Sequence, residues 1–113
     1  MKKLFEIRNL IFYKEEFLDD LSEFEDIIPI IEELSRELTY EEIEVVGMNE
    51  CCDKTNKNYI IEIPGFLDED DEFITKSEAE ELINSGKEKM LDLFVIRLYK
   101  CVECHKWIID ILE

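Results

Sequence analysis

The sequence predicts a small α+β protein spanning residues 1–113 as a single domain, with an antiparallel sheet of two hairpins and two or three helices packed on one face. Two observations predict this fold. Apolar residues recur at helical spacing in the first third of the chain, and two later regions contain β-branched and aromatic runs separated by polar turns. The length suits one domain, and 46% of the residues are hydrophobic, which is enough to form a core.

The N-terminal third is predicted to be mainly helical. Residues 4–13 are apolar on both faces and could form a strand or the start of a helix. The apolar residues that follow at helical spacing are Phe17, Leu18, Leu21 and Phe24. A second helix is predicted around Pro29, because proline suits a first helical turn, where its missing N–H would have no partner. The apolar side of that helix would contain Ile30, Ile31, Leu34 and Leu38.

The middle of the chain predicts the first hairpin of the sheet. Residues 43–48 and 59–63 are β-branched and aromatic runs, and the polar stretch 53–58 between them would form a long loop. Pro64-Gly65 is expected to end the second of these strands.

The C-terminal part predicts one more helix and the second hairpin. Ser77 and Glu80 have the spacing of a capping box, and Gly86 suits the position just after the end of a helix. Residues 93–100 and 107–112 have strand-like composition, and residues 101–106 would join them as a turn.

The net charge is strongly negative. Thirteen Lys and Arg residues against 30 Asp and Glu residues give a formal charge of −17. An excess of this sign favours solubility and attraction to basic surfaces, and it disfavours direct binding to nucleic acid or to an anionic membrane. Residues 4–13 contain Glu6, Arg8 and Asn9, so they do not form the unbroken apolar segment of a signal peptide, and we expect a cytoplasmic protein.

The four cysteines are the most informative residues. The stretch 99–107, with Cys101-Val102-Glu103-Cys104 at its centre, resembles a zinc knuckle of the zinc-ribbon type. In such knuckles a C-x-x-C turn closes a hairpin and directs both sulfurs at one ion. The zinc-ribbon pattern usually has Gly after the second Cys, whereas this chain has His105. Apart from this difference, the resemblance implies a metal site at the tip of the second hairpin, with Cys101 and Cys104 as ligands.

Cys51 and Cys52 would supply the other two ligands that a tetrahedral structural site needs. They lie at the tip of the first predicted hairpin, but adjacent residues on an extended strand point to opposite faces. Both can bind one ion only if the backbone turns there, and His105 is the substitute if one of them does not. We predict a structural Zn²⁺ ion bound by Cys51, Cys52, Cys101 and Cys104.

Other interpretations of the cysteines remain. Four buried free thiols packed as small hydrophobic groups are the main alternative. Cys101-x-x-Cys104-His105 also matches the attachment sequence of c-type haem, with Met48 or Met90 as the axial ligand. A redox pair would need a helix after the C-x-x-C sequence, and a Cys nucleophile paired with His105 lacks a third orienting group.

The acidic loop after residue 67 superficially resembles a calcium-binding EF-hand loop. The alignment that places Glu78 at the final ligand position puts Leu67 at the first and Glu72 where Gly is required. A solvated acidic loop is therefore expected. The sequence contains no phosphate-binding loop, dinucleotide fingerprint or nucleophile elbow, and we expect no enzymatic activity. Trp107 is expected in the core beside the metal site.

These observations favour a binding protein. A rigid surface of carboxylates can replace phosphates in a basic groove, so the preferred function is inhibition of a basic partner, such as a nuclease or another nucleic-acid-binding enzyme. In size and charge the chain resembles, in type only, phage-borne anti-restriction and anti-CRISPR proteins and toxin-immunity proteins. A zinc-stabilised adaptor that binds through an apolar patch is the alternative, followed by a metalloenzyme with an open coordination position. The carboxylates predicted to contact the partner are Glu15, Glu16, Asp19, Asp20, Glu23, Asp68, Glu69, Asp70, Asp71 and Glu72.

Overall fold

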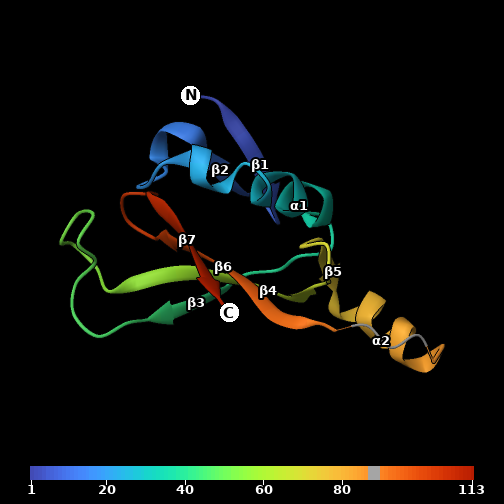
Figure 1. The fold of residues 1–113 in the computed structure, drawn as a ribbon. Coiled ribbons are helices and arrows are strands. Elements are labelled where there is room, and N and C mark those ends of the chain that lie inside the picture. The colour runs from blue at the N-terminus through green and yellow to red at the C-terminus, as the bar shows by residue number, and fades with distance from the viewer. Residues whose placement is uncertain (87–89) are drawn as a thin grey trace. The chain divides into compact units, whose positions relative to one another are not determined.

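The computed structural model describes residues 1–86 and 90–113 (Figure 1). Within them it confirms a small α+β protein. It has two α-helices and two antiparallel sheets, where the sequence predicted one sheet. The elements are β1 (Lys3–Ile7), β2 (Leu10–Tyr13), the 3₁₀ turns η1 (Lys14–Glu16) and η2 (Leu21–Phe24), α1 (Ile27–Leu34), β3 (Glu41–Glu44), β4 (Lys57–Leu67), β5 (Phe73–Thr75), α2 (Lys76–Asn84), β6 (Asp92–Cys101) and β7 (Trp107–Leu112).

The chain forms two compact units. Unit 1 contains Met1–Ile61 and Leu98–Ile109, and unit 2 contains Glu62–Arg97 and Asp110–Glu113. Strands β4, β6 and β7 each contribute residues to both units. That the 113 residues form one domain stays a prediction, as does the packing of the helices on one face of the sheet.

In unit 1, strands β1 and β2 form a separate two-stranded antiparallel sheet. Their connection is Arg8-Asn9, with φ angles of 49° and 70°. Positive φ at both residues is the backbone of the two-residue turn that matches the twist of a hairpin. The sequence did not distinguish a strand from a helix over residues 4–13, because this turn lacks the glycine that usually indicates it.

The helix predicted over Phe17, Leu18, Leu21 and Phe24 is wrong, because the only helical turn in that segment is the short 3₁₀ turn η2. Phe17 forms a parallel bridge with Trp107, and the Leu18 N–H donates to the Trp107 carbonyl at 3.0 Å. Asp20 begins η2 by accepting the Ser22 N–H at 3.0 Å. These bonds use backbone groups that a continuous helix would need.

Helix α1 has Pro29 in its first turn, as predicted, and buries Ile31. It ends at Leu34, so Leu38 lies beyond it and is not on its apolar side. In α2 the capping residue is Thr75 and not Ser77. The Thr75 hydroxyl accepts the Glu78 N–H at 3.2 Å, so the predicted capping box is displaced by two residues. Gly86, with φ 75°, follows the end of α2 as predicted.

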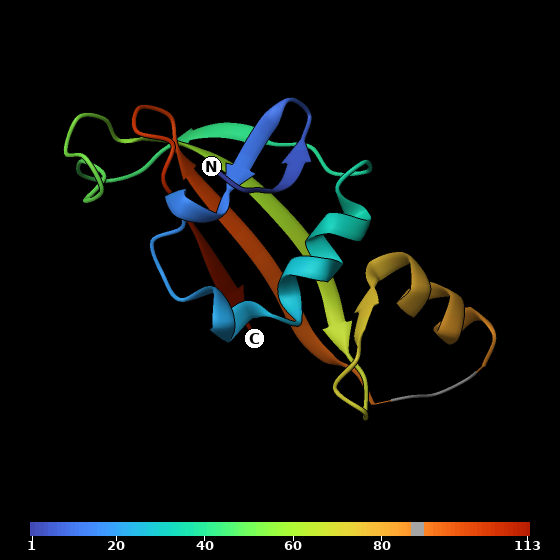
Figure 2. The same cartoon turned by 90° about the horizontal axis from the view of Figure 1, so that it is seen from above.

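The larger sheet has the strand order β3-β4-β6-β7, with β5 paired to β4. It contains both predicted hairpins, although the strand predicted at 43–48 is β3, which ends at Glu44. The arrows of β6 and β7 point in opposite directions in Figure 2. The predicted strand end at Pro64-Gly65 is wrong. Strand β4 continues to Leu67 because Gly65 and the two residues after it pair with β5.

We expect Gly65→Ala to destabilise the protein by about 1–3 kcal/mol, the usual cost of overpacking. A methyl group on Gly65 would overlap the Phe73 ring and lie 2.7 Å from the Ile74 carbonyl oxygen. Alanine is otherwise preferred over glycine inside a strand. A loss of stability would therefore show that Phe73 and Ile74 approach Gly65 too closely for a methyl group. Urea unfolding followed by circular dichroism measures the change, and an unchanged or higher midpoint would contradict the packing.

The core of unit 1 is centred on Trp107, which is fully buried. Its ring centroid lies 5.6 Å from that of Phe5, 5.1 Å from that of Phe12 and 4.5 Å from that of Phe17. The indole N–H donates to the Tyr13 carbonyl at 2.9 Å. Trp107 is therefore a core residue that joins β7 to the β1–β2 hairpin.

Candidate metal centre

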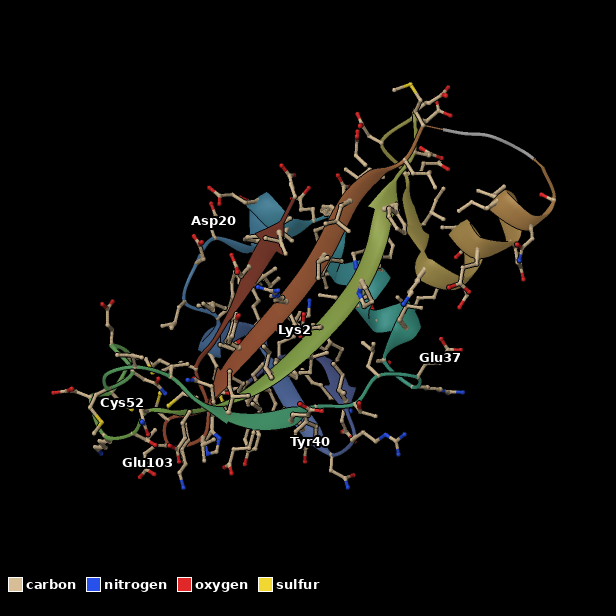
Figure 3. The ribbon with its side chains drawn as sticks, turned by 90° about the horizontal axis from the view of Figure 1, so that it is seen from below. Lys2, Asp20, Glu37, Tyr40, Cys52 and Glu103 are labelled. Carbon is tan, nitrogen blue, oxygen red and sulfur yellow. The ribbon has the colours of Figure 1, made fainter. Side chains whose placement is uncertain are left out.

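Two loops of unit 1 bring the four cysteines together. Cys51 and Cys52 lie in the loop between β3 and β4, whereas Cys101 ends β6 and Cys104 lies in the turn before β7. The two loops are side by side in both Figure 1 and Figure 2, and Figure 3 shows sulfur atoms close to the labelled Cys52. All four Sγ atoms lie within 4.8 Å of one another, so they could hold a metal ion.

The β6–β7 turn has the backbone expected of the knuckle. The Cys101 N–H donates to the Lys106 carbonyl at 2.9 Å, and the His105 N–H donates to the Cys101 carbonyl at 3.1 Å. His105 has φ 68°, the left-handed conformation that glycine adopts at least cost. His105 therefore adopts a backbone conformation that a glycine at this position would also adopt.

The β3–β4 loop makes the turn on which the prediction for Cys51 and Cys52 depended. The Asp53 N–H donates to the Asn49 carbonyl at 2.7 Å, and Asp53 has φ 52°. This turn allows adjacent cysteines to face the same point. The Cys104 Sγ lies 3.2 Å from the Cys51 Sγ, and the Cys52 Sγ lies 3.7 Å from the Cys101 Sγ.

Asn49 is a part of the site that the sequence did not reveal. Its Nδ2 donates to the Cys101 Sγ at 3.3 Å and to the Asn58 Oδ1 at 3.1 Å. Asn58 is buried and donates back to the Asn49 Oδ1 at 2.9 Å. The hydrogen bonds with Asn58 therefore hold the Asn49 amide toward the Cys101 sulfur. No sequence motif indicates such a pair of asparagines.

The thiols differ in acidity. Burial opposes ionisation of Cys101, but the Cys104 N–H, the Asn49 amide and the Glu103 N–H outweigh it and lower the pKa of Cys101 to about 6. Burial and the neighbouring thiols raise the pKa of Cys51. Metals bind the thiolate form, so the lowered pKa of Cys101 favours it as a metal ligand.

His105, the predicted substitute ligand, is exposed and does not belong to the group of four sulfurs. Its carbonyl instead accepts a hydrogen bond from the Lys100 ammonium at 2.6 Å. The segment after the C-x-x-C sequence is strand β7 and not a helix, so the arrangement of a helix-based redox pair is absent from this hairpin.

The first group of predicted partner-binding carboxylates makes bonds within the chain. The Glu15 carboxylate accepts the Lys2 N–H at 2.6 Å, which lowers the pKa of Glu15. Glu16 lies 3.4 Å from the Lys100 ammonium, and Asp19 accepts the Asp20 N–H at 2.8 Å. Asp20 accepts the Ser22 N–H, as described above, and Glu23 is exposed.

The second group forms the turn between β4 and β5 in unit 2. Asp68 is buried, and its Oδ1 accepts the N–H groups of Asp70 and Glu72, each at 2.9 Å. Its role is to shape the turn. The other members of the group are exposed: Glu69, Asp70, Asp71 and Glu72.

A groove of about 500 Å³ lies in unit 2 beside this turn. Its carboxylates come from Asp68, Glu72, Glu78 and Glu81, and its apolar lining comes from Phe73, Ile74 and Leu82. The sequence singled out Glu78 only as a calcium ligand in the rejected EF-hand alignment, and it did not single out Glu81. Their spacing of three residues places them on one face of α2, which is the signal that could have found them.

Comparison with known proteins gives no match to a family model, a curated protein or a solved structure. None of the helices in residues 1–86 and 90–113 has the length and apolarity needed to cross a bilayer. A function is therefore inferred from the chemistry of the residues themselves.

Proposed function

We propose that this protein is a non-enzymatic acidic binding protein that holds a structural zinc ion and inhibits a basic, nucleic-acid-handling partner. The observation that carries the proposal is the groove of unit 2, whose lining combines four acidic residues with three apolar ones. The net charge of −17 adds long-range attraction to basic surfaces.

Zinc suits the cysteine cluster. Four Zn–S bonds of about 2.3 Å in a tetrahedron require sulfur–sulfur distances of about 3.8 Å. The distances of 3.7 Å and 3.2 Å between paired sulfurs, and the limit of 4.8 Å for the whole group, bracket that value. Four thiolates leave no open coordination position, which is the arrangement of a structural and not a catalytic site. Thiolates also suit iron, and elemental analysis of the purified protein separates the two metals.

The groove has the chemistry that a lysine or arginine side chain requires. Long basic side chains place their aliphatic stem against apolar surface and keep the charged head among polar groups. Phe73, Ile74 and Leu82 would contact the stem, and the carboxylates of Glu72 and Glu81 would accept hydrogen bonds from the head. A partner that normally binds phosphates presents such side chains, so occupation of the groove would compete with nucleic acid.

We expect the double variant Glu72→Gln/Glu81→Gln to bind a Lys/Arg-rich model peptide at least about tenfold more weakly than the unchanged protein, since each charge-assisted hydrogen bond is worth about 1.5–3 kcal/mol. The matched control is Glu32→Gln/Glu33→Gln on α1, which removes the same charge from exposed positions. Titration calorimetry at several salt concentrations measures both, with duplex DNA added as a competitor for the peptide.

If both double variants bind the peptide equally weakly, net charge alone attracts the peptide. The proposal that the groove binds it would then be wrong. Binding that DNA does not reduce would contradict competition for the same basic side chains. Contacts made by charges should weaken steeply as salt is added.

A second candidate function is a zinc-stabilised adaptor that recognises its partner through apolar contacts. It is favoured by Val46 and Met48, which are 105% and 57% exposed in the loop that also contains Cys51 and Cys52. Gly47 between them has open space around it. Binding by this loop would be insensitive to salt and would be lost in Val46→Ser/Met48→Ser, whereas binding by the groove would not.

A further inference from the structure

Lys100 is the only buried cation among the described residues, in a chain with a large excess of acidic groups. Its side chain is 3% exposed. The ammonium donates to the His105 carbonyl at 2.6 Å, lies 3.4 Å from the Glu16 carboxylate and sits 5.2 Å from the centre of the Phe12 ring. All these groups belong to unit 1.

The position of Lys100 is unusual for a lysine. Removal of an ammonium from water is costly unless partners compensate for its lost hydration. Glu16 is a long contact for a buried ion pair, and the Phe12 ring face adds a weaker attraction. The shortest contact is with His105, which directly follows the metal-site residue Cys104, and Lys100 itself directly precedes Cys101. The buried charge therefore lies against the knuckle turn.

We propose that Lys100 is the counter-cation of the metal centre, a positioning residue that offsets the negative charge of the four thiolates without binding the ion. Zn²⁺ with four thiolates carries two net negative charges. The residues that flank the ligands in the chain include the further acidic groups Glu50, Asp53 and Glu103. The neighbouring cations Lys54 and Lys106 are exposed, and solvent screens them more strongly than it screens a buried ammonium.

The same contacts give Glu16 an opposing role. Its carboxylate neutralises part of the charge on Lys100, so its removal should leave more positive charge for the metal centre. An ion pair that only stabilised the fold would behave differently, because loss of either partner would then weaken the structure around the metal in the same direction. The signs of the two effects distinguish these possibilities.

The inference rests on the zinc ion of the proposed function, and the test compares zinc affinity in Lys100→Met, Glu16→Gln and the unchanged protein by competition with a chromophoric chelator. Lys100→Met should weaken zinc binding by roughly 10- to 100-fold, as is typical when a group that supports a metal ligand is removed. Glu16→Gln should leave the affinity unchanged or raise it. Absorption of the Co²⁺-substituted proteins checks that all retain four thiolate ligands.

A loss of affinity in both variants, or no loss in Lys100→Met, would overturn the role of Lys100. If Lys100→Met does not fold, Glu16→Gln decides alone: a higher zinc affinity supports the role of Lys100, and an unchanged or lower affinity overturns it. If the unchanged protein retains no zinc, the proposed structural site fails and the inference falls with it. An intact site that is insensitive to Lys100 would overturn only the inference.

Discussion

Cys101→Ser and Cys104→Ser will each abolish retention of the metal and lower the free energy of unfolding by several kcal/mol. Binding at structural zinc sites has an apparent free energy of about 10–16 kcal/mol at pH 7, and it is coupled to folding. A serine hydroxyl does not replace a thiolate ligand. Cys101 also accepts the Asn49 amide at 3.3 Å, so its loss removes a ligand and a hydrogen-bond acceptor together.

Native mass spectrometry before and after chelation measures the metal, and a melting curve of the same samples measures stability. The control is His105→Asn, because asparagine tolerates the left-handed backbone that His105 adopts. This variant should keep the metal if the four cysteines are the ligands. If melting is unchanged in both cysteine variants, the structural-metal proposal is wrong, and loss of metal in the control would assign His105 to the ligand set.

Trp107→Ala should lower the free energy of unfolding by about 3–5 kcal/mol, the usual cost of truncating a buried aromatic residue. The indole touches three aromatic rings, and its loss also leaves the Tyr13 carbonyl without its donor. Trp107→Phe keeps an aromatic ring and loses only the N–H group and part of the volume, so it should cost less.

Guanidinium unfolding followed by circular dichroism measures both changes, since the chain has one tryptophan and its fluorescence is lost with the substitution. The control is Ile108→Ala, the next residue of β7, which is 38% exposed. A similar cost for Ile108→Ala and Trp107→Ala would contradict the central place of Trp107 in unit 1.

The sequence predicted those parts of the fold that have strong local signals. The C-x-x-C turn, the β6–β7 hairpin around it and the meeting of the two cysteine pairs follow from ligand chemistry and from runs of β-branched residues. The Arg8-Asn9 turn could not be recognised because neither residue is a glycine. The 3₁₀ turns near Phe17 depend on bonds to Trp107, a residue far along the chain that no local pattern includes.

The remaining errors have the same cause. Two overlapping capping boxes, at Thr75 and at Ser77, are equally good locally, and pairing of β5 with β4 selects the first. Pro64-Gly65 ends many strands, but here Gly65 pairs with β5. The groove could not be predicted because its carboxylates come from a turn and a helix that meet only in the folded structure.

The division of unit 1 has a consequence for synthesis of the chain. Unit 1 consists of residues 1–61 and residues 98–109, so it cannot form before the second segment is synthesised. Cys104, which contacts Cys51, is added 53 positions after it. At about 5–20 residues per second the delay lasts roughly 3–10 seconds. During that interval Cys51 and Cys52 have been made without their partners on the β6–β7 turn. The proposed zinc site therefore requires that these two thiols stay reduced until the other two have been synthesised.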